Sequence, residues 1–131
     1  MFQPGPTTKV YLAVGPTDMR KSFDTLSGLV RSWSHPENQE NGSPEFDPLS
    51  GHLFIFCNRR RDRLKMLFFD GHGLWLCAKR LERGTFNWPQ PNDCHSCQVG
   101  LSTNELNLLL SGLDLSQTRK RRWWRKQINA A

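Results

Sequence analysis

The strongest constraint on the fold is a stretch in which three apolar runs follow one another closely, with two short polar turns between them. The runs are Leu53–Cys57, Leu64–Phe69 and Leu74–Ala78. Each has the length and composition of a β-strand, and the sequence DGHG at Asp70–Gly73 is typical of a tight turn. The stretch therefore predicts an antiparallel meander of three strands, followed by a shorter fourth strand at Gly84–Trp88.

The turn lengths predict the register of these strands. A four-residue loop at Arg59–Asp62 and a three-residue loop at Gly71–Gly73, with a glycine free to adopt a positive φ, define the facing pairs. They are Leu53–Phe68, Ile55–Met66 and Cys57–Leu64, then Phe68–Leu76 and Met66–Ala78. One face of the sheet is then wholly apolar. The opposite face carries aromatic and lysine side chains, among them Phe54, Phe56, Lys65, Phe69, Trp75 and Lys79.

Two segments outside the meander have helical patterns. Apolar residues at spacings of four and three predict a helix from Thr17 or Asp18 to about Trp33. The capping box Ser102–Glu105 predicts a second helix, which runs to about Ser111 and ends at Gly112. Further short strands are expected at Val10–Val14 and Val99–Leu101.

These elements predict a single α+β domain over residues 9–115, with a mainly antiparallel four- or five-stranded meander sheet and two helices. The helix over 18–33 is expected on the apolar face and the helix over 102–111 near the other face. An extended arm is expected at residues 1–8 and a long loop at 34–50. Residues 116–131 form a basic tail that is expected to be disordered by itself.

The net charge of +6 is unevenly distributed along the chain. Residues 59–88 contain eight basic and three acidic side chains, and residues 119–131 contain six basic and no acidic ones. The two remaining segments, 1–58 and 89–118, are net acidic. This segregation favours a polyanionic partner.

The arginines of the first turn are the best candidates for nucleic-acid contacts, because arginines on a projecting turn can neutralise phosphates. With the basic residues that follow them, the candidates are Arg59, Arg60, Arg61, Arg63, Lys65, Lys79, Arg80 and Arg83. Phe54, Phe56, Phe69 and Trp75 on the same sheet are candidates for base stacking. The alternative is that the helix over 102–111 covers this face and that the arginines form a solvated turn.

The C-terminal tail interleaves six cations with two indoles, a pattern that suits an arm that orders on DNA or RNA. Its candidate residues are Arg119, Lys120, Arg121, Arg122, Trp123, Trp124, Arg125 and Lys126. The alternatives are a basic terminus without function and a contact with a protein partner.

Several motifs together resemble the TnpB-type, or second-open-reading-frame, accessory protein of the insertion-sequence-66 family of bacterial transposable elements. The motifs are DMRKSFD, NRRRDRLK, DGHGLWL, KRLERGTF and LSTNELNLLLSGLD, in the expected order over residues 9–115. The resemblance implies a role in transposition beside a larger transposase. It implies no catalytic residues. We therefore expect a non-enzymatic factor that binds DNA or the transposase–DNA complex.

Two other functions remain open. A protein–protein adaptor would dock on the transposase through an exposed apolar patch of Phe54, Phe56 and Trp75. A divalent-metal nuclease would require converging carboxylates, for which the candidates are Asp24, Asp47, Asp70 and Glu82.

No metal or other cofactor is expected. Cys94 and Cys97 resemble half of a zinc site, but the remaining cysteines, Cys57 and Cys77, lie on opposite faces in the predicted register. Four cysteines embedded in this way do not form a secreted disulfide framework. No apolar run has the length of a membrane span and no signal pattern is present, so we expect a cytoplasmic protein.

Overall fold

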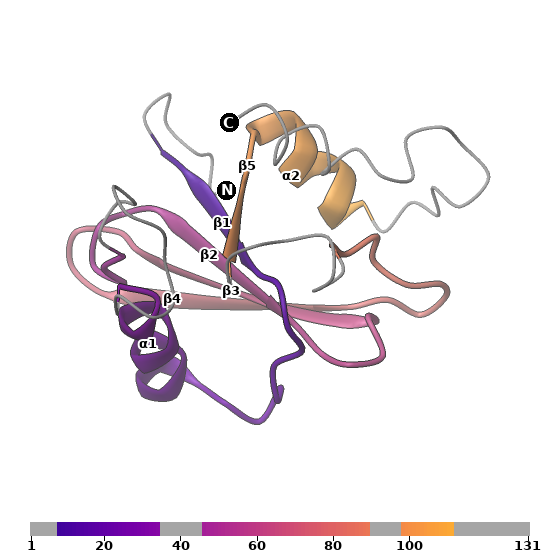
Figure 1. The fold of residues 1–131 in the computed structure, drawn as a ribbon, viewed down its shortest axis with the longest axis horizontal. Coiled ribbons are helices and arrows are strands. Elements are labelled where there is room, and N and C mark those ends of the chain that lie inside the picture. Colours follow the sequence, from indigo (N-terminus) through magenta and orange to yellow (C-terminus); the bar gives the residue numbers. More distant parts are fainter. Residues whose placement is uncertain (1–7, 35–45, 90–97, 112–131) are drawn as a thin grey trace.

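A five-stranded sheet with one helix on each face forms the core of the protein (Figure 1). The structure is a computed structural model that describes residues 8–34, 46–89 and 98–111. The elements are β1 (Val10–Ala13), α1 (Phe23–Ser32), β2 (Leu53–Cys57), β3 (Arg63–Phe69), β4 (Leu74–Arg80), β5 (Gln98–Leu101) and α2 (Thr103–Leu110). The predicted N-terminal arm, most of the long loop, Cys94, Cys97, Gly112 and the basic tail lie outside the described residues.

The strand order is β4-β3-β2-β1-β5, and every neighbouring pair is antiparallel except β1 and β2, which run parallel. The predicted α+β class with a mainly antiparallel sheet is confirmed. The predicted strand at Gly84–Trp88 is wrong, because this segment is irregular. Phe86 donates its backbone N–H to the carbonyl of Arg61, and the Trp88 indole donates to the carbonyl of Ala13 at 2.8 Å. The segment thus packs on the sheet through two buried rings without joining it.

The predicted register is right for one turn and wrong for the other. Cys57 faces Leu64 and Ile55 faces Met66, as predicted. Across the second turn, however, Phe68 faces Trp75, because Asp70 belongs to the loop and makes it four residues long. This shift of one residue moves every β4 side chain to the opposite face.

Both faces of the sheet are apolar, and the two helices cover them in the reverse of the predicted order. Helix α1 packs on the face of Phe54, Phe56 and Leu67 through Leu26 and Val30. Helix α2 contributes Leu106 and Leu109 to the other cluster, which contains Leu53, Ile55 and Cys57. Because β2 is buried on both sides, its apolar run does not reveal which face receives which helix.

Helix α1 is shorter than predicted. Its N-cap is Ser22, and residues 18–21 form a turn in which Lys21 donates its backbone N–H to the carbonyl of Asp18. The capping box of α2 is present as predicted, with Ser102 and Glu105 each accepting the backbone N–H of the other.

Candidate nucleic-acid interface

Asn58 organises the turn between β2 and β3. Its side-chain oxygen accepts the backbone N–H groups of Asp62 and Arg63, both at 3.1 Å. Its amide nitrogen donates to the Asp62 carboxylate at 2.7 Å, and this bond is the main cause of the lowered pKa of Asp62. The turn is therefore closed by its own side chains, which fixes the positions of the arginines on it.

The arginines of this turn are not equivalent. Arg59, Arg60 and Arg63 are exposed, whereas Arg61 is half-buried. Arg61 has a φ of 64°, in the left-handed region that side chains rarely adopt, and its carbonyl accepts the N–H of Phe86. Its Nη1 is buried without a hydrogen-bond partner in the described part of the chain, and burial lowers its pKa. Arg61 is thus placed differently from its three neighbours.

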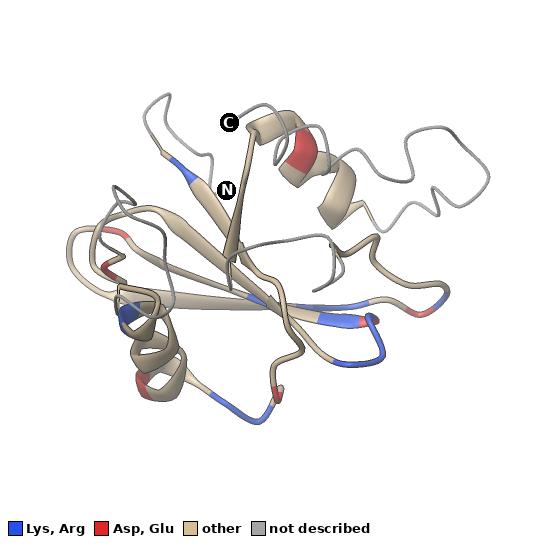
Figure 2. Cartoon of the chain, viewed as in Figure 1, with Lys and Arg blue, Asp and Glu red and all other residues tan. Residues whose placement is uncertain are grey.

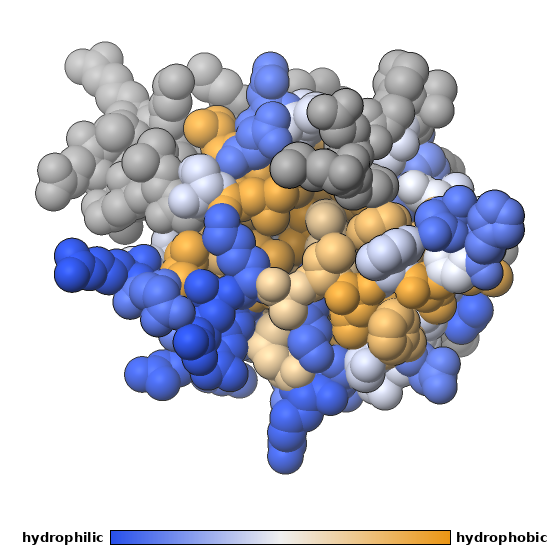
Figure 3. Space-filling view, turned by 180° about the vertical axis from the view of Figure 1, so that it is seen from behind, coloured by the Kyte–Doolittle hydropathy of each residue, from blue (hydrophilic) through white to orange (hydrophobic). Residues whose placement is uncertain are grey.

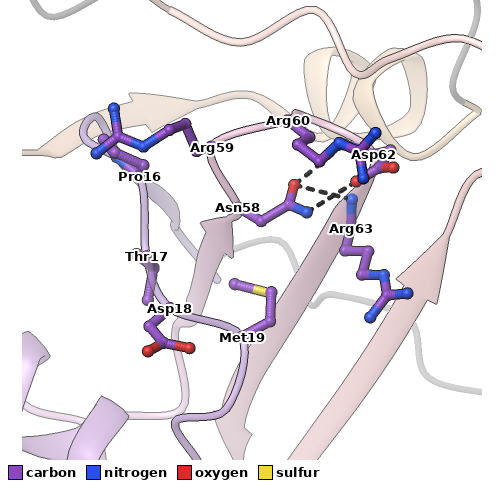
Figure 4. Close-up of a pocket in the computed structure, with 9 residues that line it drawn as sticks. All are labelled: Pro16, Thr17, Asp18, Met19, Asn58, Arg59, Arg60, Asp62 and Arg63. Atoms are coloured by element: carbon purple, nitrogen blue, oxygen red, sulfur yellow. Dashed lines mark hydrogen bonds between the residues drawn. The ribbon is translucent and has the colours of Figure 1, made fainter.

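A groove of about 570 Å³ separates the turn from the chain at Pro16–Met19 (Figure 4). Arg59, Arg60 and Arg63 line one side of it. The opposite wall is attached to the sheet by the Thr17 N–H, which donates to the carbonyl of Cys57 at 2.7 Å. The groove is therefore formed by two segments that are far apart in the sequence.

A second cavity of about 450 Å³ continues this groove along the ends of β3 and β4, since both are lined by Met19 and Arg63. Its basic lining residues are Arg63, Lys65, Lys79 and Arg80. Arg63 and Arg80 face each other directly across the two strands. Like charges in facing positions destabilise a sheet, so this pair is poorly explained by stability alone.

Several lysine and arginine positions of the chain lie together at this end of the sheet, and a second short basic stretch lies before α1 (Figure 2). Among the described residues, ion pairs join Arg20 to Asp18 at 2.7 Å and Arg80 to Glu82 at 3.1 Å. Bonds from the side chain and backbone of Arg20 lower the pKa of Asp18 to about 2. Arg59, Arg60 and Arg63 form no such ion pair with the acids that the structure describes. The charges of Arg60 and Arg63 do contribute to lowering the pKa of Asp62, which also lines the groove. The three arginines are therefore among the cations that can contact a ligand there.

Two of the predicted lysines make contacts within the protein. Lys65 Nζ donates to the carbonyl of Lys21 at 2.8 Å and so ties the segment before α1 to the sheet. Lys79 Nζ donates to the carbonyl of Leu110 at the end of α2. Arg83 is exposed and lies outside both cavities. The eight candidates of the tail lie outside the described residues.

The aromatic residues proposed for base stacking do not form an exposed face. Phe54 and Phe56 are buried under α1, and Phe69 is partly buried. Trp75 is 54% exposed, but one side of its ring stacks on Phe68 and its indole N–H donates to Asp70 at 2.7 Å. The apolar patch expected for an adaptor is likewise reduced to Trp75.

The carboxylates considered for a nuclease do not converge. Asp70 accepts the N–H groups of Gly73 and His72 and the Trp75 indole, and Glu82 pairs with Arg80. Asp47 caps its own loop by accepting the N–H of Leu49, and Asp24 lies exposed on α1. No cluster of three or more metal-binding side chains occurs in the described ranges.

The cysteine geometry corrects one prediction. Because β4 is shifted, Cys57 and Cys77 lie on the same face, although β3 runs between them. Burial raises the pKa of the Cys57 thiol to about 12, which disfavours the thiolate that a metal requires.

Two components of the groove are missing from the sequence-based prediction: the wall at Pro16–Met19 and the role of Asn58. Met19 fits the apolar spacing of the helix predicted from Thr17 or Asp18, so the spacing places most of this wall in a helix. The prolyl residue Pro16 and the possible Asx turn at Asp18 were the signals that favoured an irregular segment.

The structure defines a small α+β protein in which three arginines, without ion pairs to the described acids, line one side of a groove at one end of a mixed sheet. Its sequence matches the family described as IS66 Orf2 like protein over residues 8–120. The chain therefore belongs to this family, as its motifs predicted, and membership supports an accessory role in the transposition of an insertion sequence.

Two relatives come from Sinorhizobium fredii (strain NBRC 101917 / NGR234). The uncharacterized protein y4hO is 35% identical over 114 residues, which cover 87% of this chain and 88% of that protein. The uncharacterized protein y4jC is 31% identical over 121 residues, which cover 92% of each chain. No solved structure matches the chain. None of the helices in the described ranges is long and apolar enough to cross a membrane.

Proposed function

We propose that this protein is a non-enzymatic transposition factor that binds the phosphate backbone of element DNA in the groove beside the β2–β3 turn. The DNA is either free or already in complex with the transposase. The observation that carries the proposal is the state of Arg59, Arg60 and Arg63. They line one groove and are free of ion pairs to the acids that the structure describes. The basic tail adds a second set of cations to the same interaction.

The chemistry of the groove favours phosphates over bases. Guanidinium groups form charge-assisted, often bidentate hydrogen bonds to phosphate oxygens. None of the residues that line the two cavities is aromatic, so neither cavity offers a stacking platform. Binding should therefore depend strongly on salt and weakly on sequence.

A salt titration tests the proposal. Full-length protein is titrated with a labelled DNA duplex at several salt concentrations, and the slope of log K against log salt is compared with that of R59A/R60A/R63A. Each phosphate contact contributes about 0.9 to the slope, so the triple variant should reduce it by up to about 3 and weaken binding.

The matched control is Arg31, which is exposed on α1 and lies outside the groove. R31A removes the same type of charge and should leave the slope nearly unchanged. Equal slopes for wild type and the triple variant would show that these arginines do not contact phosphate. Binding to the transposase that survives nuclease treatment, without any binding to DNA, would favour the adaptor function.

A further inference from the structure

Strand β4 lies at one edge of the sheet and has seven residues, as does its neighbour β3. Its first five residues, Leu74–Ala78, contain no charge and no proline. Exposed edge strands usually carry a charged residue, a proline or a bulge, because an open edge without them pairs readily with another strand. Along this strand Trp75, Cys77 and Ala78 are exposed. Seen from the side opposite to that of Figure 1, hydrophobic surface occupies the middle of the molecule beside strongly hydrophilic side chains (Figure 3).

The hydrogen bonds within the sheet identify which backbone groups of β4 have no partner in the described ranges. The carbonyl of Gly73 accepts the N–H of Asp70, and the N–H of Leu81 donates to the carbonyl of Asp62. Odd-numbered residues of β4 therefore direct their backbone groups toward β3, since these directions alternate along a strand. The groups that face the open edge belong to Leu74, Leu76, Ala78 and Arg80.

This pattern is self-complementary about Cys77. An antiparallel copy of β4, related by a two-fold axis at Cys77, places Leu76 opposite Ala78 and Leu74 opposite Arg80. These are the residues with open backbone groups, so each facing pair exchanges two hydrogen bonds. A register centred on Leu76 or Ala78 would leave one end of the seven-residue strand without a partner.

Charge supports the same arrangement. The antiparallel register places Lys79 opposite Trp75 and Arg80 opposite Leu74, so no two cations face each other. A parallel copy in register would place Lys79 beside Lys79 and Arg80 beside Arg80, which is destabilising.

We propose that a second copy of this chain pairs with the open edge of β4, antiparallel and centred on Cys77, to form a two-fold dimer with a continuous ten-stranded sheet. This inference does not depend on the proposed function. The Cys77 residues of the two copies form a non-hydrogen-bonded pair, in which the Cα atoms are about 4.5 Å apart. That distance is within the range of a disulfide.

Cross-linking tests this geometry. In full-length protein carrying C94S and C97S, Cys77 is the exposed cysteine that remains, since Cys57 is buried. Mild oxidation should give a disulfide-linked dimer on a non-reducing gel. The control C77S/A78C moves the thiol by one residue. It should give no link, because the two residues at position 78 are diagonal neighbours about 7–8 Å apart.

The oligomeric state gives an independent test. Sedimentation equilibrium of the reduced protein should give the mass of a dimer. A78P removes an N–H that faces the open edge and so should yield a monomer whose unfolding temperature is close to that of the wild type. If A78P does not fold, the cross-linking result still decides. A monomeric mass at all micromolar concentrations, or equal cross-linking at positions 77 and 78, would overturn the proposal.

Discussion

Asp70 shows how a single carboxylate determines the pairing of two strands. Its Oδ1 accepts the N–H groups of His72 and Gly73, and its Oδ2 accepts the indole N–H of Trp75. These bonds draw Asp70 into the turn, where Gly71 has a φ of 102°. The glycines in the sequence correctly predicted a turn, but its length depends on side-chain bonds that glycine spacing does not encode.

Acidification should reveal this role of Asp70. Three hydrogen bonds lower the pKa of Asp70 to about 2 from an ordinary value of 3.8. The backbone N–H of Gly73 has the largest effect, and the backbone N–H of His72 and the indole N–H of Trp75 have smaller ones. Because the folded-state pKa lies below the unfolded-state value, the stabilisation is complete above pH 3.8 and is lost as the pH falls through about 2.

D70N should therefore unfold at a lower temperature than the wild type at pH 6. The difference between the two unfolding temperatures, here called the gap, should become smaller between pH 4 and pH 2. Thermal unfolding followed by circular dichroism measures the gap. Asp18 and Asp62 titrate in both proteins, so their effects cancel in the comparison. A gap that is independent of pH would contradict this role of the carboxylate.

At the scale of elements, the β2–β3 hairpin was predicted in length and register, whereas the arrangement around it was not. Its four-residue loop and apolar pairs follow from local sequence. The faces taken by α1 and α2 do not, because alternate residues of β2 are apolar on both sides. The sequence also does not predict which arginines are exposed. Arg61 and Arg60 are the same residue type, and they differ in backbone conformation.

The hairpin should lose rigidity when Asn58 is replaced. N58A removes two hydrogen bonds to backbone N–H groups and one to Asp62, so we expect the free energy of unfolding to fall by about 1–2 kcal/mol. Urea denaturation measures the change. Asn107 is exposed on α2, and N107A, which favours the helix, should not destabilise the protein. Equal effects of the two changes would show that the Asn58 bonds add no stability.

At the scale of the whole molecule, the protein is a sheet between two apolar clusters, one under each helix. The α+β class and the concentration of charge at one end were readable from the sequence. The division into two clusters was not, because it depends on the positions of Phe46, Phe86 and Trp88, which lie in segments without regular structure. Their burial depends on contacts between distant parts of the chain.

This architecture predicts that Phe54 is essential to stability. Its side chain is 1% exposed and its ring lies 5.9 Å from that of Tyr11, so F54A should cost about 3–5 kcal/mol. Phe23 provides the control, because it is 42% exposed and F23A should cost much less. Chemical denaturation distinguishes the two variants. A small loss for F54A would contradict the placement of this ring inside the α1 cluster.

The position of β1 has a consequence for the order in which the chain acquires its structure. This strand lies between β2 and β5. Strand β2 begins 40 residues after the end of β1, beyond α1, and β5 is the last strand within the described ranges. During synthesis from the N-terminus, β1 emerges from the ribosome long before either neighbour exists. The local hairpins of β2, β3 and β4 can assemble first, and β1 is enclosed only when residues 98–101 have been added.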